Sequence, residues 1–199
     1  MKINTVSLIP RIISLFLIPV SLILMPSCNR SKAGASASKV TNAEKLGFPK
    51  GSKVIILHCD DAGMCEEANI AVKNYFETGD IRSAAVMVPC EFAMDMVEWA
   101  KTQDSPDLGV HLTLTSEWHN WRWGTVADPA RVPGLIDQEG KMWKSVPEVV
   151  THASAEEVET EVRAQIDRVI AAGYRPSHID THMGTLYASP EYVRVFLKI

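Results

Sequence analysis

The feature that most constrains the fold is an alternation of short apolar runs with amphipathic stretches after residue 46. The apolar runs predict strands at 53–59, 81–88, 108–114 and 177–180. Apolar residues spaced three and four apart predict helices at 64–78, 91–102 and 155–172, with a last helix beginning after Ser189 and Pro190. Such alternation implies parallel strands with helices packed outside them. We therefore expect an α/β fold with about four β/α units, enough for an open sheet or about half of an eight-fold barrel.

One long segment, residues 115–150, interrupts this alternation and shows no clear periodicity. It contains Trp118, Trp121 and Trp123, so we expect an ordered loop rather than a disordered one. The tryptophans could stack on the apolar face of a sugar ring, which would make them substrate-binding residues. Alternatively, they only anchor the loop, because a large aromatic side chain buries much area for little lost freedom.

The N-terminal region is expected to direct export. Lys2 and Arg11 precede a strongly apolar run at 12–24, which is short for a membrane span and contains Pro19. The run ends before Cys28, so residues 1–28 are predicted to be a lipoprotein signal with Cys28 as the lipidated residue and a membrane surface as its partner. An ordinary secretory signal or an uncleaved anchor is the alternative. Residues 29–45 are predicted to be a flexible linker, and 46–199 the folded domain.

Composition excludes two functional classes. The net charge is -4, with 20 Lys and Arg against 24 Asp and Glu, so no basic surface for nucleic acid is expected. The four cysteines show no CxxC spacing, which argues against a zinc finger or a thioredoxin-like centre.

Polar clusters follow three of the predicted strands. They are Asp60 and Asp61 after the first strand, His111 on the third, and His178, Asp180 and His182 at the fourth. The carboxyl ends of parallel strands lie at one edge of a sheet, where active sites are built. One carboxylate and two imidazoles suit a divalent metal with open positions. Each cluster also has a plain alternative: an Asp capping a helix, a core histidine, or local hydrogen bonding at a strand end.

Three segments carry a family resemblance. Asp60-Asp61-Ala62-Gly63 resembles the Asp-Asp-x-Gly motif of the YdjC-like carbohydrate deacetylases. Residues 109–115 are similar to the family's Gly-x-His-Leu-x-Leu-Thr segment, and residues 177–182 to its Thr/Ser-His-x-Asp-x-His segment. The three segments occur in the same order as in the family. The chain has His58 and Cys59 where members often have Asn and Ala. The resemblance implies a distorted (β/α) barrel of the polysaccharide-deacetylase type, here truncated after about four units. It also implies metal-dependent removal of acetyl groups from N-acetylated amino sugars.

The resemblance assigns roles to individual residues. It implies that Asp61, His111 and His182 bind the metal and that Asp60 is the general base. The cofactor is a divalent ion, Mg²⁺ or Zn²⁺: two histidines favour zinc, and the resemblance favours magnesium.

Two further roles follow from position in the sequence. His178 is predicted to protonate the leaving amine, and Asp180 to orient a ligand histidine. For both, a structural hydrogen bond is the alternative.

Two other functions are compatible with these residues. One is a surface lipoprotein that binds glycans without turnover. The other is a metal-dependent esterase or phosphoesterase, of which the phosphoesterase is less favoured because few basic residues lie near the motifs.

Overall fold

The computed structural model describes residues 40–199, which divide into two units, 40–52 and 53–199. The first unit contains α1 (Asn42–Lys45), which begins with a capping box between Thr41 and Glu44. The predicted signal at 1–28, its Cys28, and most of the predicted linker at 29–45 lie outside the described residues. Within residues 40–199, no helix combines the length and hydrophobicity needed to cross a membrane.

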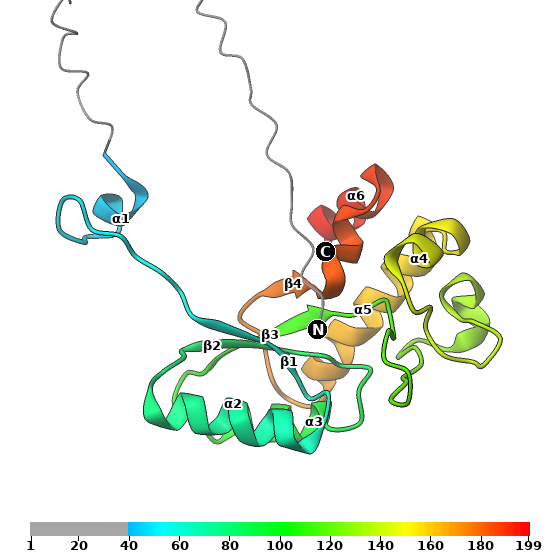
Figure 1. Ribbon diagram of the computed structural model, residues 1–199, viewed down its shortest axis with the longest axis horizontal. Helices are drawn as coiled ribbons and strands as arrows, with labels where there is room; N and C mark the ends of the chain where they lie inside the picture. The colour runs from blue at the N-terminus through cyan, green and yellow to red at the C-terminus, as the bar shows by residue number, and fades with distance from the viewer. Residues whose placement is uncertain (1–39) are drawn as a thin grey trace, which may run out of the picture. The chain divides into compact units, whose positions relative to one another are not determined.

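The second unit is built on one sheet of four parallel strands in the order β1-β2-β3-β4, which confirms the predicted α/β architecture (Figure 1). The strands are β1 (His58–Ala62), β2 (Ser83–Val86), β3 (Asp107–Leu112) and β4 (Ile179–Thr181). Sequential neighbours pair because each crossover carries a helix or a long loop back to the amino end of the next strand.

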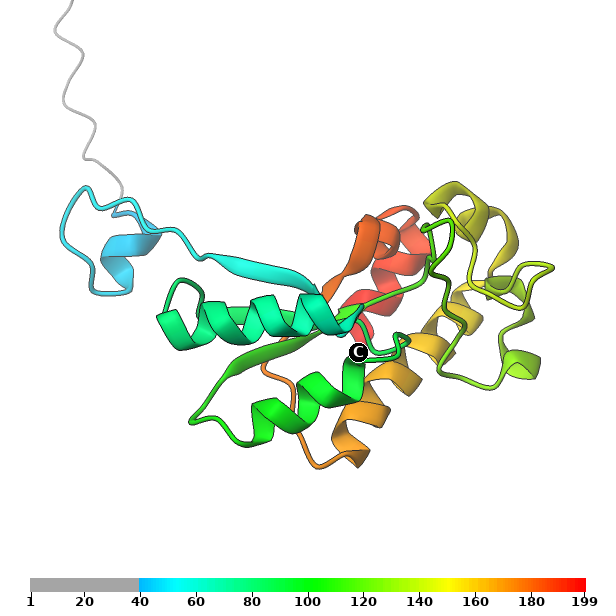
Figure 2. The same ribbon diagram turned by 60° about the horizontal axis from the view of Figure 1, so that its bottom comes forward.

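Helices pack against one face of this sheet. The α-helices of the unit are α2 (Glu66–Thr78), α3 (Ala93–Lys101), α4 (Val146–His152), α5 (Ala155–Ala171) and α6 (Pro190–Lys198). Short 3-10 helices are η1 (Pro129–Arg131), η2 (Pro133–Leu135) and η3 (His182–Tyr187). Figure 2 shows α2 and α3 next to each other on one side of the strands. Val72 of α2, Val97 of α3 and Val162 of α5 share one core with Val86 and Val110 of the sheet.

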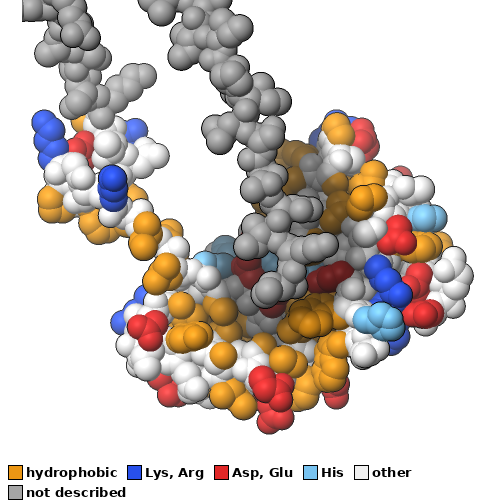
Figure 3. Space-filling view, viewed as in Figure 1, with side chains coloured by type: hydrophobic (Ala, Val, Ile, Leu, Met, Phe, Trp, Pro, Cys, Tyr) orange, Lys and Arg blue, Asp and Glu red, His pale blue; other side chains and the backbone are white. Residues whose placement is uncertain are grey.

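Three predictions about the elements need correction. Residues 54–57 do not form the first strand: Ile55 and Ile56 are 78% and 80% exposed, and the strand begins at His58. Figure 3 shows hydrophobic side chains, in orange, along the segment that leads into β1; Figure 1 shows the same segment as a ribbon. Ile170 and Tyr75 belong to the apolar spacing that predicts α5 and α2 and is expected to face the core, yet they are 52% and 49% exposed.

The other face of the sheet is polar. Because side chains alternate along a strand, the residues between the core positions point to this second face. A row across the first three strands is formed by the register partners His58, Ser83 and Asp107. Further along, His111 pairs in register with Asp180 of β4. One face of the sheet therefore packs against the hydrophobic core, and the other face carries titratable side chains.

Candidate metal centre

An irregularity near the end of β1, where the pairing register with β2 shifts between Cys59 and Ala62, orients Asp61, and the chain turns directly afterwards at Gly63. Asp61 itself has a left-handed backbone, with φ 60°, and Gly63 has φ 86°. A Cβ on Gly63 would lie 2.7 Å from the Cα of Ala93, so only glycine fits against the start of α3. The Gly63 N–H donates to Asn69 Oδ1 at 2.7 Å, which ties the turn to α2. Helix packing on both sides therefore fixes the direction of the Asp61 carboxylate.

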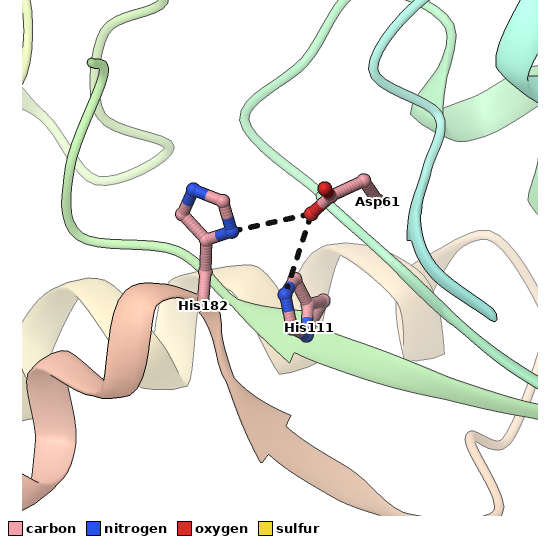
Figure 4. Close-up of side chains that lie close together, drawn as sticks. All are labelled: Asp61, His111 and His182. Atoms are coloured by element: carbon pink, nitrogen blue, oxygen red, sulfur yellow. Dashed lines mark ion pairs between the residues drawn. The ribbon is translucent and has the colours of Figure 1, made fainter. Parts of the chain in front are cut away.

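Two histidines approach that carboxylate from β3 and from the end of β4. His111 lies on β3, and His182 lies directly after β4 at the start of η3. Asp61 Oδ1 is 3.2 Å from His182 Nδ1 and 3.4 Å from His111 Nε2, and both rings are almost completely buried (Figure 4). One ligand atom from each residue lies within 4.8 Å of the others. The structure thus brings together all three residues predicted to bind the metal.

The second nitrogen of each ring is held by a carboxylate. His111 Nδ1 lies 2.7 Å from Asp180 Oδ1, where an orienting residue is predicted, and His182 Nε2 lies 2.9 Å from Glu117 Oε1. A carboxylate on the outer nitrogen fixes the tautomer and the ring orientation of a metal-binding histidine. Glu117 comes from the 115–150 segment, and no periodic pattern in that segment indicates its role.

The charges around His182 shift its pKa strongly. Burial of the ring opposes protonation, but Asp61 and Glu117 on its two sides outweigh burial and raise the pKa of His182 to about 9. In turn, the contact with His182 holds the pKa of the Asp61 carboxyl below its ordinary value, although burial opposes this. In the absence of a cation these groups stabilise one another as an ion-paired cluster. A metal bound to His182 must displace its proton.

The cluster fits a divalent cation. Asp61 Oδ1 is buried and has no hydrogen-bond partner within residues 40–199, so an acceptor is aimed at the space between the two imidazoles. Two imidazoles and one carboxylate are a donor set that catalytic zinc and related divalent ions use, with further positions open to water and substrate. Asp61, His111 and His182 would hold the ion, and Asp180 and Glu117 would orient the rings.

Asp60 lies next to Asp61 in β1, but its carboxylate contacts His58 and neither of the two buried histidines. Its side chain is 56% exposed, and His58 Nε2 lies 3.2 Å from its Oδ1. The same nitrogen is 3.5 Å from Asp180 Oδ2. Sequence reasoning gave His58 no role. The signal was the alternation of the strand, which places His58, Asp60 and Asp180 on one face of the sheet once β1 is located correctly.

His178 lies elsewhere on the polar face. It immediately precedes β4, and its Nδ1 is 3.2 Å from Asp107 Oδ1 and 2.9 Å from Ser177 Oγ. Asp107 is the first residue of β3, so this contact lies toward the amino ends of the strands. His178 is not part of the group formed by Asp61 and the two buried histidines. Its predicted role as the proton donor stays a prediction.

The three tryptophans predicted to bind substrate differ in exposure. Trp123 is 5% exposed, and its indole N–H donates to the carbonyl of Thr115, so it anchors the loop. Trp118 and Trp121 are 52% and 44% exposed. They line a hollow of ≈ 430 Å³ together with Phe92 and residues 64–67, which follow the Asp61 turn. Trp121 also donates from its indole nitrogen to the Met64 carbonyl at 3.1 Å.

Two buried polar residues of α5 support the loop and the third strand. Glu161 accepts from the backbone N–H groups of Val126 and Ala127 at 3.0 and 2.8 Å. Gln165 accepts from the N–H of Thr113 and donates to its carbonyl, just beyond β3. These bonds satisfy backbone groups where the chain leaves the sheet, so α5 holds the 115–150 segment beside the centre.

Comparison with known proteins agrees with this architecture. The family model described as YdjC-like protein matches residues 54–199. A carbohydrate deacetylase of Thermus thermophilus is 35% identical over 156 residues, which are 78% of this chain and 53% of the relative. A carbohydrate deacetylase of Brevibacillus brevis is 32% identical over 145 residues, 73% of this chain and 54% of the relative.

A solved structure shares the fold. It is a crystal structure of a candidate cellobiose-phosphate cleavage protein from Enterococcus faecalis V583, with TM-score 0.65 and 26% identity over 72% of this chain and 53% of that one. The chain spans about half the length of the curated relatives it matches. Because the family model matches most of the chain, from the segment before β1 through α6, the chain belongs to the YdjC-like family.

Proposed function

We propose that this chain carries the metal-dependent centre of a carbohydrate deacetylase that removes acetyl groups from N-acetylated amino sugars. The observation that carries the proposal is the convergence of Asp61, His111 and His182 on one point, with Asp60 next to it. Relatives named carbohydrate deacetylase, and a Yersinia enterocolitica relative named chitooligosaccharide deacetylase that is 25% identical over 133 residues, support the substrate class.

The residues of the centre have different roles in the proposed amide hydrolysis. A divalent cation held there would supply Lewis-acid chemistry, polarising a carbonyl and lowering the pKa of water. Asp61, His111 and His182 fix its position, and the carboxylates of Asp180 and Glu117 keep both rings in the ligand orientation. Two imidazoles in the donor set favour zinc over magnesium.

Asp60 is the general base in this proposal. Its carboxylate is the exposed member of the adjacent pair, whereas Asp61 Oδ1 is buried toward the histidines. An exposed carboxylate beside the centre can take a proton from the attacking water, which contributes roughly 10²–10⁴-fold to the rate of such reactions.

Trp118 and Trp121 are proposed to bind the sugar. Their exposed indoles line a hollow formed by the residues that directly follow the Asp61 turn. A tryptophan side chain offers a large apolar surface that suits the apolar face of a sugar ring, and the side chain loses little rotamer freedom on binding. Trp123 is buried and is omitted from the proposed substrate-binding residues.

Acetate release tests the proposal. The zinc- and magnesium-loaded protein is incubated with N-acetylglucosamine and with its oligomers, and free acetate is measured. We expect turnover that chelator abolishes, loss of at least about 10²-fold in Asp60→Asn with metal retained, and loss of both metal and turnover in Asp61→Asn. His119→Ala is the matched control, because His119 is an exposed histidine of the loop whose side chain bonds Asn120.

Other outcomes favour the alternatives. Glycan binding that persists in chelator without acetate release would identify a non-catalytic glycan-binding protein, for which the Trp118 and Trp121 hollow is the supporting observation. Faster hydrolysis of O-acetyl or phosphate esters than of acetamides would identify an esterase instead.

We also propose that the protein is exported and anchored at a membrane through Cys28. The apolar run at 12–24 before Cys28 supports this. Cys28→Ser is expected to move the protein from the membrane fraction to the soluble fraction of cells, and unchanged membrane association would contradict lipidation at Cys28.

A further inference from the structure

His58 is a titratable side chain on the polar face of the sheet that has no place among the three proposed metal ligands. It is the first residue of β1, two positions before Asp60, so both side chains point to the same face. Its Nε2 lies between two carboxylates, 3.2 Å from Asp60 Oδ1 and 3.5 Å from Asp180 Oδ2. Its Nδ1 lies 2.7 Å from Ser83 Oγ on β2.

The hydrogen-bonding capacity of these groups fixes the orientation of the His58 ring. An ionised carboxylate only accepts, so the nitrogen that faces Asp60 and Asp180 must carry a proton. The other nitrogen, Nδ1, lies 2.7 Å from the Ser83 hydroxyl, which holds that end of the ring and also contacts the Asp107 carboxylate. Ser83 is 5% exposed, so it is a fixed partner rather than a mobile surface group.

Asp60 depends on this ring. Within the described part of the chain, the Asp60 carboxylate makes no hydrogen bond, and its one ion-pair contact is with His58. Its side chain is 56% exposed, so without His58 no contact among residues 40–199 holds the carboxylate in one rotamer. Asp180, the second carboxylate on His58, uses its other oxygen to hold His111. His58 therefore connects the exposed carboxylate to the scaffold of the centre.

We infer that His58 is a positioning residue: its Nε2–H, held in place by Ser83, directs the Asp60 carboxylate toward the centre and couples it to Asp180. This inference rests on the proposed role of Asp60 as general base. Displacement of a reacting group by about 1 Å can cost roughly 10²-fold in rate. Removing His58 should therefore lower kcat while leaving KM and metal affinity unchanged.

A set of variants of the full chain tests this role. His58→Ala is expected to lose roughly 10-fold to 100-fold in kcat. His58→Gln places an amide N–H near the position of Nε2 and should restore most of the activity, whereas His58→Asn reaches only the position of Nδ1 and should behave like His58→Ala. In an Asp60→Asn background, His58→Ala should cost nothing further, because two residues that act through one group are not additive.

A second readout does not need activity. In the ¹⁵N spectrum of the imidazoles, His58 Nε2 should be of the protonated type and should shift in Asp60→Asn, while the ring of His119 should not. If this holds and the native protein releases no acetate, the proposed function fails and the His58–Asp60 coupling stands. A His58 signal that ignores Asp60→Asn overturns the inference, as do additive losses in the double variant or a KM change alone.

Metal stoichiometry gives the remaining outcome. His58, Asp60 and Asp180 also present three ligand atoms within 4.8 Å of one another. Native protein that binds two equivalents of zinc, and His58→Ala that binds one, would make His58 a metal ligand and overturn the positioning role. One equivalent in both proteins is the result we expect.

Discussion

Gly63 gives the sharpest prediction about how the fold holds the centre. Its φ of 86° lies in the left-handed region, and a Cβ there would meet Ala93 Cα at 2.7 Å and Val86 Cγ2 at 2.9 Å. Both neighbours are fully buried, so neither can move into solvent. The left-handed backbone costs an alanine about 1–2 kcal/mol, and overpacking of a close-packed core costs about 1–3 kcal/mol more.

Gly63→Ala should therefore lower the free energy of unfolding by roughly 2–5 kcal/mol, a large part of the ~5–15 kcal/mol of a typical domain. Gly140 is the matched control: its φ is 72°, but a Cβ there would have nothing within 4 Å. Gly140→Ala should cost only the backbone part, about 1–2 kcal/mol. Urea unfolding followed by circular dichroism measures both. Equal costs for the two variants would refute the claim that Gly63 is required by close contact with α3.

Three further predictions concern buried groups and the metal. Glu161→Ala should cost about 2–5 kcal/mol in urea unfolding, because the Val126 and Ala127 N–H groups lose their acceptor; Glu161→Gln keeps one oxygen and should cost clearly less, and equal costs would contradict this. Burial, with smaller effects of nearby acidic groups, raises the pKa of Cys90 from 9.0 to about 12. Its thiol should therefore resist alkylation at pH 8 until the protein unfolds. The free energy of unfolding should fall as the pH rises above 9, because the thiol of the unfolded chain ionises before that of the folded protein. Rapid labelling of Cys90 in the native protein, read by mass spectrometry, would contradict its burial. Zinc at 100 times its Kd should stabilise the protein by about 2.7 kcal/mol, seen as a higher Tm that chelator reverses, and a Tm indifferent to zinc would argue against a site present only in the folded state.

The alternation of strands and helices and the parallel sheet could be predicted from the sequence, but the position of the first strand could not. The run at 54–57 has the composition of a buried strand, yet Ile55 and Ile56 are exposed and β1 is the polar segment that begins at His58. Hydrophobic periodicity marks strands whose side chains face a core. It cannot mark β1, because His58, Asp60 and Asp61 of this strand are polar groups in or beside the centre.

The proposed metal ligands could be predicted because the carboxyl ends of parallel strands converge. Asp61 and His111 lie at or near the ends of β1 and β3, and His182 directly follows β4. Glu117 could not be predicted as a partner of His182, since it comes from a loop without periodicity.

Two buried residues of α5 did leave a signal in the sequence. Glu161 and Gln165 occupy positions on the same helix face as Val158, Val162 and Val169, and polar residues within an apolar stripe indicate buried hydrogen bonds. Their partners, Val126 and Thr113 among them, are more than thirty residues away in the sequence. Only the packed structure identifies these pairs.

The measurement that tests the central claim most directly is a calorimetric titration of the protein with zinc and with magnesium, native against Asp61→Asn. Asp61 is the proposed ligand that both buried histidines face, and its Oδ1 has no hydrogen-bond partner within residues 40–199. We predict that the native protein binds one equivalent of metal and that Asp61→Asn, still folded by circular dichroism, binds none. Native protein that takes up no metal, or a folded variant that binds as tightly as the native chain, would contradict a metal centre at Asp61, His111 and His182.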